Sequence, residues 1–210
     1  MPYDMNNDEL LLSVENLSKR FEDKIITQQL SFSVFKGEKV ALKGTSGQGK
    51  STILNIILGF GFQDSGTVSF KNRTLSPENI NFFRTNIAWL PQSLSLDTKV
   101  ENVFTNVKNY KNNRVSLDKL DELLLFFNLS KDILKQNFQK LSGGERQRIG
   151  IINAMLLNRE LMILDEPVSA MDAGIKTKTI DFLFNNPELT ILSTSHDEEW
   201  LSRCHKIIEI

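Results

Sequence analysis

A glycine-rich stretch in the first quarter of the chain has the spacing of a phosphate-binding loop. Gly44, Gly49, Lys50 and Ser51 fill the fixed positions of the pattern G-x-x-x-x-G-K-[ST]. Glycines let successive backbone N–H groups point at phosphate oxygens, and the lysine and serine are suited to the β- and γ-phosphates and to Mg²⁺. The stretch predicts a nucleoside triphosphate site. Its residues are Gly44, Thr45, Ser46, Gly47, Gln48, Gly49, Lys50, Ser51 and Thr52.

The segments on either side of this loop support the interpretation. Residues 40–42 are apolar and strand-like, residues 53–58 are typical of a helix, and Gly59 is placed to end that helix. A helix that begins near Lys50 would direct the positive end of its dipole at a phosphate. The alternative is a glycine-rich turn before an ordinary helix, and the agreement between the loop and its flanks disfavours it.

Two acidic residues follow an apolar run at 161–164. In phosphoryl-transfer sites one carboxylate binds the metal and another orients or deprotonates the attacking water. An apolar strand that ends in two acids could by itself be a surface turn. Downstream of a phosphate loop, we interpret Asp165 as a metal ligand and Glu166 as the base.

Strand and helix patterns alternate along the chain and predict an α/β fold. Residues 76–84 are ambiguous, although Ser76-Pro77-Glu78 resembles a helix start. Ligands of a mostly parallel sheet gather where its strands end, so the phosphate loop, Asp165-Glu166 and His196 are expected along one edge. The expected strands are 10–14, 31–35, 40–42, 66–70, 87–90, 161–164 and 190–195, and later helices are expected near 143–157 and 175–185.

The composition changes between residues 93 and 140, where polar loops and an amphipathic helix are expected. Ser116 is a good N-cap, and Leu117, Leu120, Leu124 and Phe127 share one helical face. We predict one domain over 1–210, with a core of about 10–92 and 141–210 and a helical lobe of about 93–140.

Composition and charge exclude several classes of protein. Lys plus Arg number 25 against 26 Asp plus Glu, a net charge of −1 that gives no support for a nucleic-acid surface. The single cysteine, Cys204, excludes an internal disulfide and fits a reducing compartment. It stands beside His205 without further ligands, so no metal site is expected there. No signal peptide is visible, and no apolar run approaches the roughly 20 residues that cross a bilayer.

Residues 141–148 read Leu-Ser-Gly-Gly-Glu-Arg-Gln-Arg. Ser142, Gly143 and Gly144 at a helix start offer a hydroxyl, free N–H groups and a helix dipole to an anion; Gln147 and Arg148 are interpreted as packing and hydrogen-bonding residues. The stretch resembles the signature motif of ATP-binding cassette (ABC) ATPases, and the chain resembles that family from about residue 10 to its C-terminus. That resemblance implies a P-loop NTPase fold of ABC type, with a mostly parallel core sheet, an antiparallel β lobe and an inserted α-helical lobe.

The same resemblance implies roles for further residues. Gln92 matches the glutamine that senses Mg²⁺ and the γ-phosphate, and His196 matches the switch histidine. Phe21 stands where an aromatic residue stacks on adenine, and residues 169–172 resemble the D-loop with Met171 in place of leucine. Ser142 would contact the γ-phosphate held by a partner chain. The implied catalytic set is Lys50, Gln92, Glu166 and His196, and the implied Mg²⁺ ligands are Ser51, Gln92 and Asp165.

Some positions depart from the family pattern. Asn153 replaces a common arginine, which is expected to weaken a structural ion pair. The segment before the signature lacks the Gly-Glu-rich pattern of fused exporters, and the chain ends soon after the last expected strand. These features favour a minimal, separate ATPase subunit without a regulatory domain. The resemblance to small export-type ATPase subunits gives a slight preference for export.

The resemblance implies a Mg²⁺-dependent ATPase subunit of an ABC transporter, cytoplasmic and peripheral on the inner or plasma membrane. It would pair with a second copy of the cassette in an ATP-dependent homodimer and act on separate transmembrane permease subunits. The alternative is a soluble cassette ATPase of DNA repair or translation, disfavoured by the lack of a coiled coil, zinc modules or a second cassette. An ATP sensor without turnover is disfavoured by the complete catalytic set. The transported substrate is not encoded in these motifs.

Overall fold

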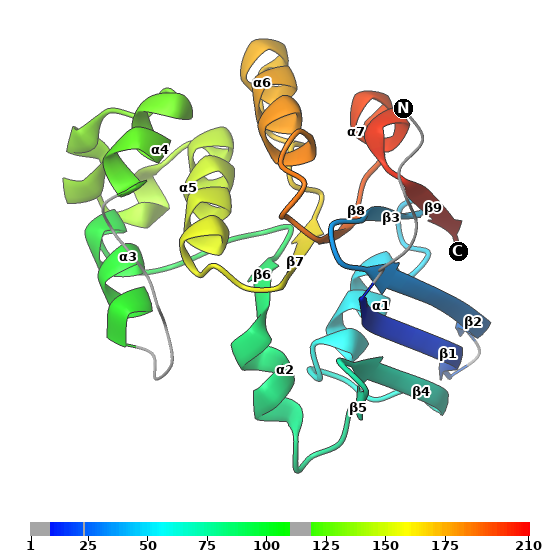
Figure 1. Cartoon of the computed structure of the whole chain (residues 1–210). Coiled ribbons are helices and arrows are strands. Elements are labelled where there is room, and N and C mark those ends of the chain that lie inside the picture. Colours follow the sequence, from blue (N-terminus) through cyan, green and yellow to red (C-terminus); the bar gives the residue numbers. More distant parts are fainter. Residues whose placement is uncertain (1–8, 23, 110–118) are drawn as a thin grey trace.

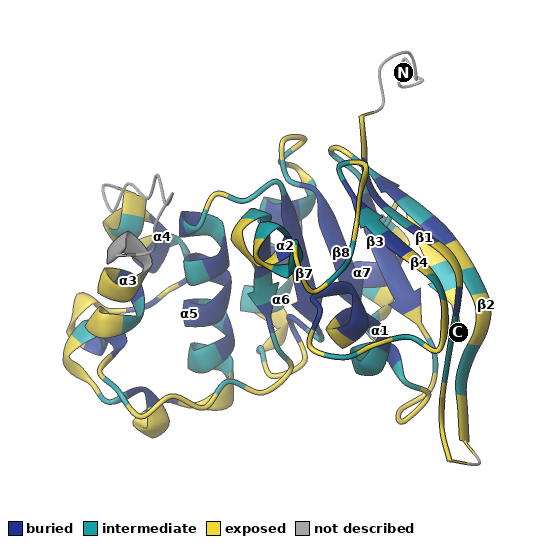
Figure 2. Ribbon diagram, turned by 90° about the horizontal axis from the view of Figure 1, so that it is seen from below, coloured by how far each residue is buried: buried dark blue, intermediate teal, exposed yellow. Residues whose placement is uncertain are grey.

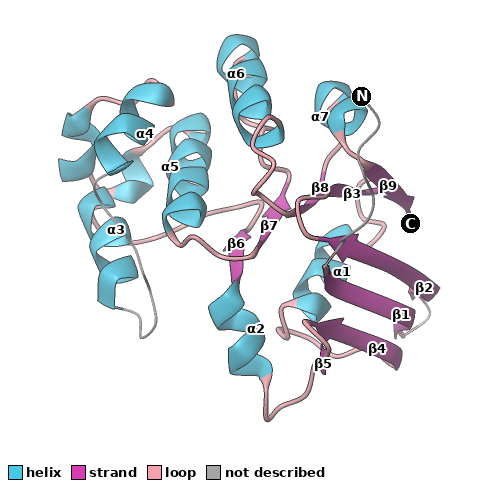
Figure 3. Cartoon of the chain, in the orientation of Figure 1, coloured by secondary structure: helices cyan, strands magenta, loops and turns pink. Residues whose placement is uncertain are grey.

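The computed structural model of the chain describes residues 9–22, 24–109 and 119–210. Its elements form a parallel sheet, an antiparallel sheet and several groups of helices (Figures 1 and 3). The predicted architecture is therefore confirmed, and its elements explain how distant motifs come together.

The parallel sheet is the centre of the molecule. Its strand order is β6-β7-β8-β3-β9 and every neighbouring pair is parallel. All residues of β7 and β8 are buried, which explains the continuous apolar run at 161–164, since strands covered on both faces need no polar side. The strands are β3 (Lys39–Lys43), β6 (Ile87–Leu90), β7 (Leu161–Asp165), β8 (Ile191–Thr194) and β9 (Lys206–Glu209).

The antiparallel sheet consists of β1 (Leu10–Phe21), β2 (Lys24–Phe35), β4 (Ser65–Phe70) and β5 (Arg73–Thr74), in the order β2-β1-β4-β5. The expected strands 10–14 and 31–35 are the inner parts of two much longer strands. The outer half of β2 is largely exposed (Figure 2), so it lacks the apolar alternation that marks a half-buried strand. Register shifts interrupt the pairing of β1 with β2 and blur the pattern further.

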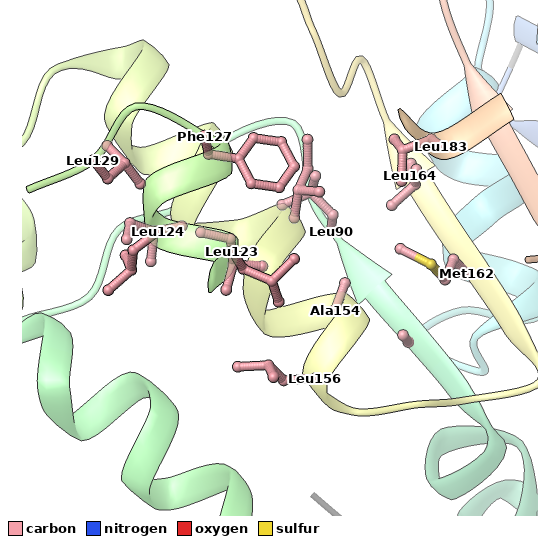
Figure 4. Packing of buried hydrophobic residues seen from close by; sticks show 14 of the residues in the cluster. Leu90, Leu123, Leu124, Phe127, Leu129, Ala154, Leu156, Met162, Leu164 and Leu183 are labelled. Carbon is pink, nitrogen blue, oxygen red and sulfur yellow. The ribbon is translucent and has the colours of Figure 1, made fainter. Parts of the chain in front are cut away.

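Helices cover both faces of the parallel sheet. Helix α1 (Lys50–Ile57) packs between the two sheets, in the same core cluster as β1, β4 and β3. Helices α5 (Gly143–Leu156), α6 (Ala173–Phe184) and α7 (Glu198–Arg203) contribute to the cluster on the opposite face (Figure 4). Alternate residues of β7 serve the two clusters: Leu161 and Ile163 face α1, whereas Met162 and Leu164 face α5 and α6.

A helical region lies beside α5, at the end of the molecule away from β9 (Figure 1). It contains α3 (Val100–Asn109), α4 (Leu120–Phe126) and 3₁₀ turns at Lys131–Lys135 and Phe138–Lys140. Phe104, Leu124 and Phe138 bury its apolar side in the cluster that includes α5. The predicted N-cap Ser116 and the face residue Leu117 lie outside the described residues. The predicted boundaries of a separate lobe stay a prediction.

Two local expectations need adjustment. Helix α2 (Ile80–Asn86) begins later than Ser76, because the Asn79 side chain accepts a hydrogen bond from the Ser76 N–H at 2.9 Å and closes a turn first. Strand β9 was not predicted; it is short and pairs only with β3 at the sheet edge.

Among the residues described, no helix has both the length and the apolar character needed to span a bilayer.

Candidate active site

Four loops meet where neighbouring strands of the parallel sheet end. The phosphate loop follows β3, Gln92 lies just after β6, Glu166 follows β7 and His196 lies just after β8. They line one pocket of about 610 Å³, which Phe21 at the end of β1 also lines. The predicted residues brought together are Phe21, Ser46, Gly47, Gly49, Lys50, Ser51, Thr52, Gln92, Asp165, Glu166 and His196.

The phosphate loop is held by its own backbone and by β2. Gly49 has φ +100° directly before α1, and a Cβ there would clash with Ile26 Cγ2, so only glycine fits. The Gln48 side-chain oxygen accepts a hydrogen bond from the Thr45 N–H. Gly44, Thr45 and Gln48 line an adjacent pocket of about 300 Å³, which shares His196 with the larger one. The loop is thus shaped before any ligand binds.

Lys50 is buried, with 7% of its surface exposed, although it carries a charge. Its ammonium donates to the backbone oxygens of Gly44 at 2.7 Å and Thr45 at 3.2 Å, and it lies 2.8 Å from His196 Nε2. An ammonium has no acceptor, so in this contact Nε2 is the acceptor. Phosphate oxygens are the kind of acceptor that can replace these partners.

The two acidic residues have different surroundings. Asp165 is 4% exposed, and its Oδ1 accepts a 2.5 Å hydrogen bond from Thr194 Oγ1, which also accepts from the Glu166 N–H at 3.0 Å. Glu166 has φ +50°, a strained conformation for a residue other than glycine. Its Oε1 is buried and lacks a hydrogen-bond partner within the described part of the chain, with His196 Nε2 at 3.5 Å. A buried acceptor without a donor is suited to binding a water.

The same pocket collects oxygen donors that suit a hard cation. The Ser51 hydroxyl, the Gln92 amide and the Asp165 carboxylate all belong to residues of its lining, and Mg²⁺ prefers such ligands. The unpartnered Glu166 Oε1 adds negative potential there. The residues therefore fit Mg²⁺. Elsewhere, Cys204 is a poor ligand because burial raises the pKa of its thiol to about 12.

Phe21 presents an aromatic face at the pocket edge. The side chain is 54% exposed, and Lys19 Nζ lies 5.0 Å from the ring centroid. Lys24 and Ile26 of β2 also line the pocket, and Lys24 Nζ donates to the Gly47 oxygen at 2.7 Å. Sequence reasoning missed Lys24 and Ile26 because it placed the strand only at 31–35; their nearness to Phe21 along the chain was the available signal.

The signature residues lie outside the pocket that the phosphate loop lines. Ser142 caps α5: its Oγ accepts from the Glu145 N–H at 3.2 Å, and the Glu145 carboxylate accepts from the Ser142 N–H at 2.8 Å. Within the described chain, Ser142, Gly143 and Gly144 are not part of the 610 Å³ pocket; Gly143 and Gln92 line a separate pocket of about 80 Å³. The structure therefore does not bring the signature onto the phosphate loop of the same chain.

Asn153, the departure from the family pattern, lies on α5. Its side-chain oxygen is buried, and no hydrogen-bond donor of the described residues reaches it. The position therefore carries an unsatisfied acceptor where the family commonly has a cationic side chain.

Solved structures share this architecture. The ATP-binding subunit of an ABC transporter matches with a TM-score of 0.84 at 26% identity, over 95% of this chain and 85% of that one. The ATP-binding cassette MJ0796, a dimer in a post-hydrolysis state with ADP and Pi, matches with a TM-score of 0.80 at 24% identity, over 95% and 94%. The fold is that of an ABC ATPase cassette.

Sequence comparison agrees. The profile of the family described as ABC transporter matches residues 27–169. The ergothioneine transport ATP-binding protein EgtV of Helicobacter pylori (strain G27) is 32% identical over 197 residues, 90% of this chain and 91% of that protein. The molybdate/tungstate import ATP-binding protein WtpC of Methanocaldococcus jannaschii is 32% identical over 192 residues, and the chain spans 63% of its length. The chain belongs to the ABC transporter family, and its class within that family is the ATP-binding ATPase subunit.

Proposed function

We propose that this chain hydrolyses ATP with Mg²⁺ and that the hydrolysis cycle drives transport through separate membrane subunits. The observation that carries the proposal is the convergence of Lys50, Glu166 and His196 on one pocket beside the phosphate loop. A cassette that only senses ATP has no need of all three. The names of the relatives, which are ATP-binding proteins of transport systems, support the coupling to transport.

Each residue has a defined task in this proposal. Phe21 stacks on adenine, and the loop N–H groups and Lys50 bind the β- and γ-phosphates. The γ-phosphate takes the place of His196 at the Lys50 ammonium. Nε2 then no longer has to accept from Lys50, so the imidazole can carry a hydrogen on Nε2 and donate it to that phosphate. At about 4 Å, a unit-charge pair in such a partly buried site is worth about 4 kcal/mol before desolvation.

Glu166 positions the attacking water. Its unpartnered Oε1 accepts a hydrogen bond from the water and orients it toward the γ-phosphorus, while Thr194 holds the neighbouring Asp165. Mg²⁺ bound through Ser51, Gln92 and Asp165 would supply positive charge to the phosphate oxygens.

A second chain completes the site. Because Ser142 lies away from the pocket of its own chain, we propose that it contacts the γ-phosphate held by a partner, in a homodimer with two shared sites. The dimeric state of MJ0796 supports this arrangement. ATP would close the dimer and hydrolysis would reopen it. The segment of about 93–140 would act as a helical lobe, and the dimer would dock on the permease subunits at the cytoplasmic face of the membrane.

For the direction of transport, the relatives weigh toward import. WtpC carries import in its name, as does the spermidine/putrescine import ATP-binding protein PotA of Marinobacter nauticus, 31% identical over 208 residues, of which this chain spans 54%. We therefore do not retain the preference for export. A role in DNA repair or translation is not proposed, because these relatives are transport proteins.

The test is Glu166→Gln, compared with the exposed Glu188→Gln as a matched control. With Mg²⁺ and ATP, the Glu166 variant should release phosphate at least a hundredfold more slowly than the wild type and accumulate as an ATP-bound dimer in size-exclusion chromatography with light scattering. Undiminished steady-state hydrolysis would contradict the base assignment, and a variant that stays monomeric would contradict the shared site.

A further inference from the structure

Gln147 joins the signature helix to the segment that carries Glu166. It lies on α5 and is 7% exposed. Its Nε2 donates to the backbone carbonyl oxygen of Glu166 and to Ser169 Oγ, both at 2.9 Å. Its Oε1 accepts from the Ala170 N–H at 3.0 Å. A glutamine amide has two donor hydrogens and an acceptor oxygen. Both donor hydrogens and the oxygen therefore form hydrogen bonds with residues 166–170.

The Glu166 backbone is clamped by these contacts. Its oxygen accepts from Gln147, from Ser169 Oγ at 3.0 Å and from the Ser169 N–H at 3.3 Å. Glu166 also has φ +50°, and a strained conformation persists only where its surroundings hold it. Because the backbone sets where a side chain begins, this clamp sets the position of the Glu166 carboxylate.

The helix is seated closely enough to act as the support. A Cβ at Gly144 would lie 2.7 Å from the Ala170 oxygen, so α5 approaches this segment at van der Waals distance without a side chain between them. The neighbouring Arg148 makes different contacts, to the oxygens of Gly144 at 3.2 Å and Phe127 at 2.9 Å. Gln147 thus faces the site, whereas Arg148 binds the helical region.

We propose that Gln147 is a positioning residue that holds Glu166 of its own chain in the geometry needed for water attack. This inference rests on the proposed function and adds to it a structural link between α5, which begins at the signature, and the base. Displacing a reacting group by about 1 Å can lower a rate on the order of a hundredfold.

The first test is Gln147→Met, which keeps an unbranched side chain of similar length and removes the amide hydrogen bonds. We expect kcat for ATP hydrolysis to fall at least tenfold, with KM and ATP affinity within twofold of wild type, because binding does not pass through Glu166. Arg148→Met is the matched control and should keep kcat within twofold. A kcat for Gln147→Met within twofold of wild type, or an equal loss in both variants, would overturn the proposal.

A double variant separates positioning from general damage. Single-turnover hydrolysis by Glu166→Gln should not slow further when Gln147→Met is added, because both changes act through the same carboxylate. Independent, multiplicative losses would show that Gln147 acts elsewhere.

Mixed dimers, purified with two affinity tags, distinguish Glu166 from Ser142 as the target. With Glu166→Gln in one chain, the remaining active site uses Glu166 of the other chain and Ser142 of the Glu166→Gln chain. Adding Gln147→Met to the Glu166→Gln chain should leave the remaining turnover unchanged, whereas adding it to the other chain should abolish at least nine-tenths of it. The opposite result would mean that Gln147 acts through the signature and would overturn the proposal.

These experiments distinguish a wrong role for Gln147 from a wrong proposed function. If the wild type hydrolyses ATP and Glu166→Gln dimerises, but Gln147→Met keeps full kcat, only this inference is lost. If the wild type releases no phosphate, the proposed function fails first.

Discussion

The ammonium nitrogen of Lys50 lies 2.8 Å from Nε2 of His196, across a sequence separation of 146 residues. This contact joins the phosphate loop after β3 to the loop after β8, two strands that pair directly in the parallel sheet. The lysine is satisfied by His196 and by loop oxygens, so a nucleotide phosphate has to replace these partners. The contact therefore describes a site held ready for an anion.

Removing the Lys50 charge should weaken nucleotide binding. Hydrogen bonds to charged groups contribute about 1.5–3 kcal/mol each, so we expect Lys50→Met to lower ATP affinity about ten- to a hundredfold in a fluorescent-nucleotide titration. The exposed Lys206→Met, at the start of β9 and outside both pockets, is the control and should bind normally. An affinity for Lys50→Met within threefold of wild type would contradict the assignment.

Phe21 should contribute through its ring rather than through its size. Stacking of a base on an aromatic side chain is worth about 1–3 kcal/mol, so Phe21→Ala should raise KM for ATP about five- to a hundredfold while kcat changes little. Phe21→Tyr keeps the ring and should restore KM. Phe62, which is 68% exposed and outside the pocket, provides a control as Phe62→Ala. Equal KM values for Phe21→Ala and wild type would remove Phe21 from the site.

The ion pair of Asp197 and Lys176, at 2.7 Å, should give stability a defined pH dependence. Burial raises the pKa of Asp197, but hydrogen bonds from Lys176 and the Trp200 N–H outweigh it, and the net pKa is lowered. The hydrogen bond to Asp197 raises the pKa of Lys176. The Asp197 contribution is present above its unfolded pKa of about 4 and is lost as pH falls through the lower folded value. The Lys176 contribution is present below about 10.4 and is lost as pH rises through the higher folded value.

Asp197→Asn tests this dependence, because asparagine preserves the N-cap of α7 and removes only the charge. Its melting temperature should be a few degrees below wild type at pH 7, and the difference should vanish as pH falls below the folded pKa of Asp197. Asp132→Asn, in an exposed ion pair with Lys135, should change little. A difference that stays constant down to low pH would show that charge is not its source.

Cys204 should be unreactive in the folded protein. Burial raises the pKa of its thiol to about 12, so the thiolate fraction at pH 8 is on the order of one in ten thousand. Alkylation by iodoacetamide should be slow at pH 8, rise about tenfold per pH unit toward pH 11 while the fold persists, and become fast in denaturant. Equal rates for folded and denatured protein at pH 8 would contradict the burial of this thiol.

Much of the fold was predictable because its signals are local. The apolar run 161–164 and the loop from Gly44 to Thr52 carry their information in consecutive residues, and both lie where expected. Strand β9 and the outer half of β2 were missed because β9 is a short edge strand and the outer half of β2 is largely exposed, so neither has the pattern of a buried strand.

The sequence by itself determined the family, the phosphate loop, the acidic pair and the histidine, because each is a pattern of residue types at short spacing. Only the tertiary structure decided that Thr194 holds Asp165, that Lys24 reaches the Gly47 oxygen and that Gln147 clamps Glu166. These contacts join residues far apart in the chain whose types are common on any strand or helix. Their meaning comes from the directions in which the folded backbone points their side chains, and no local pattern records those directions.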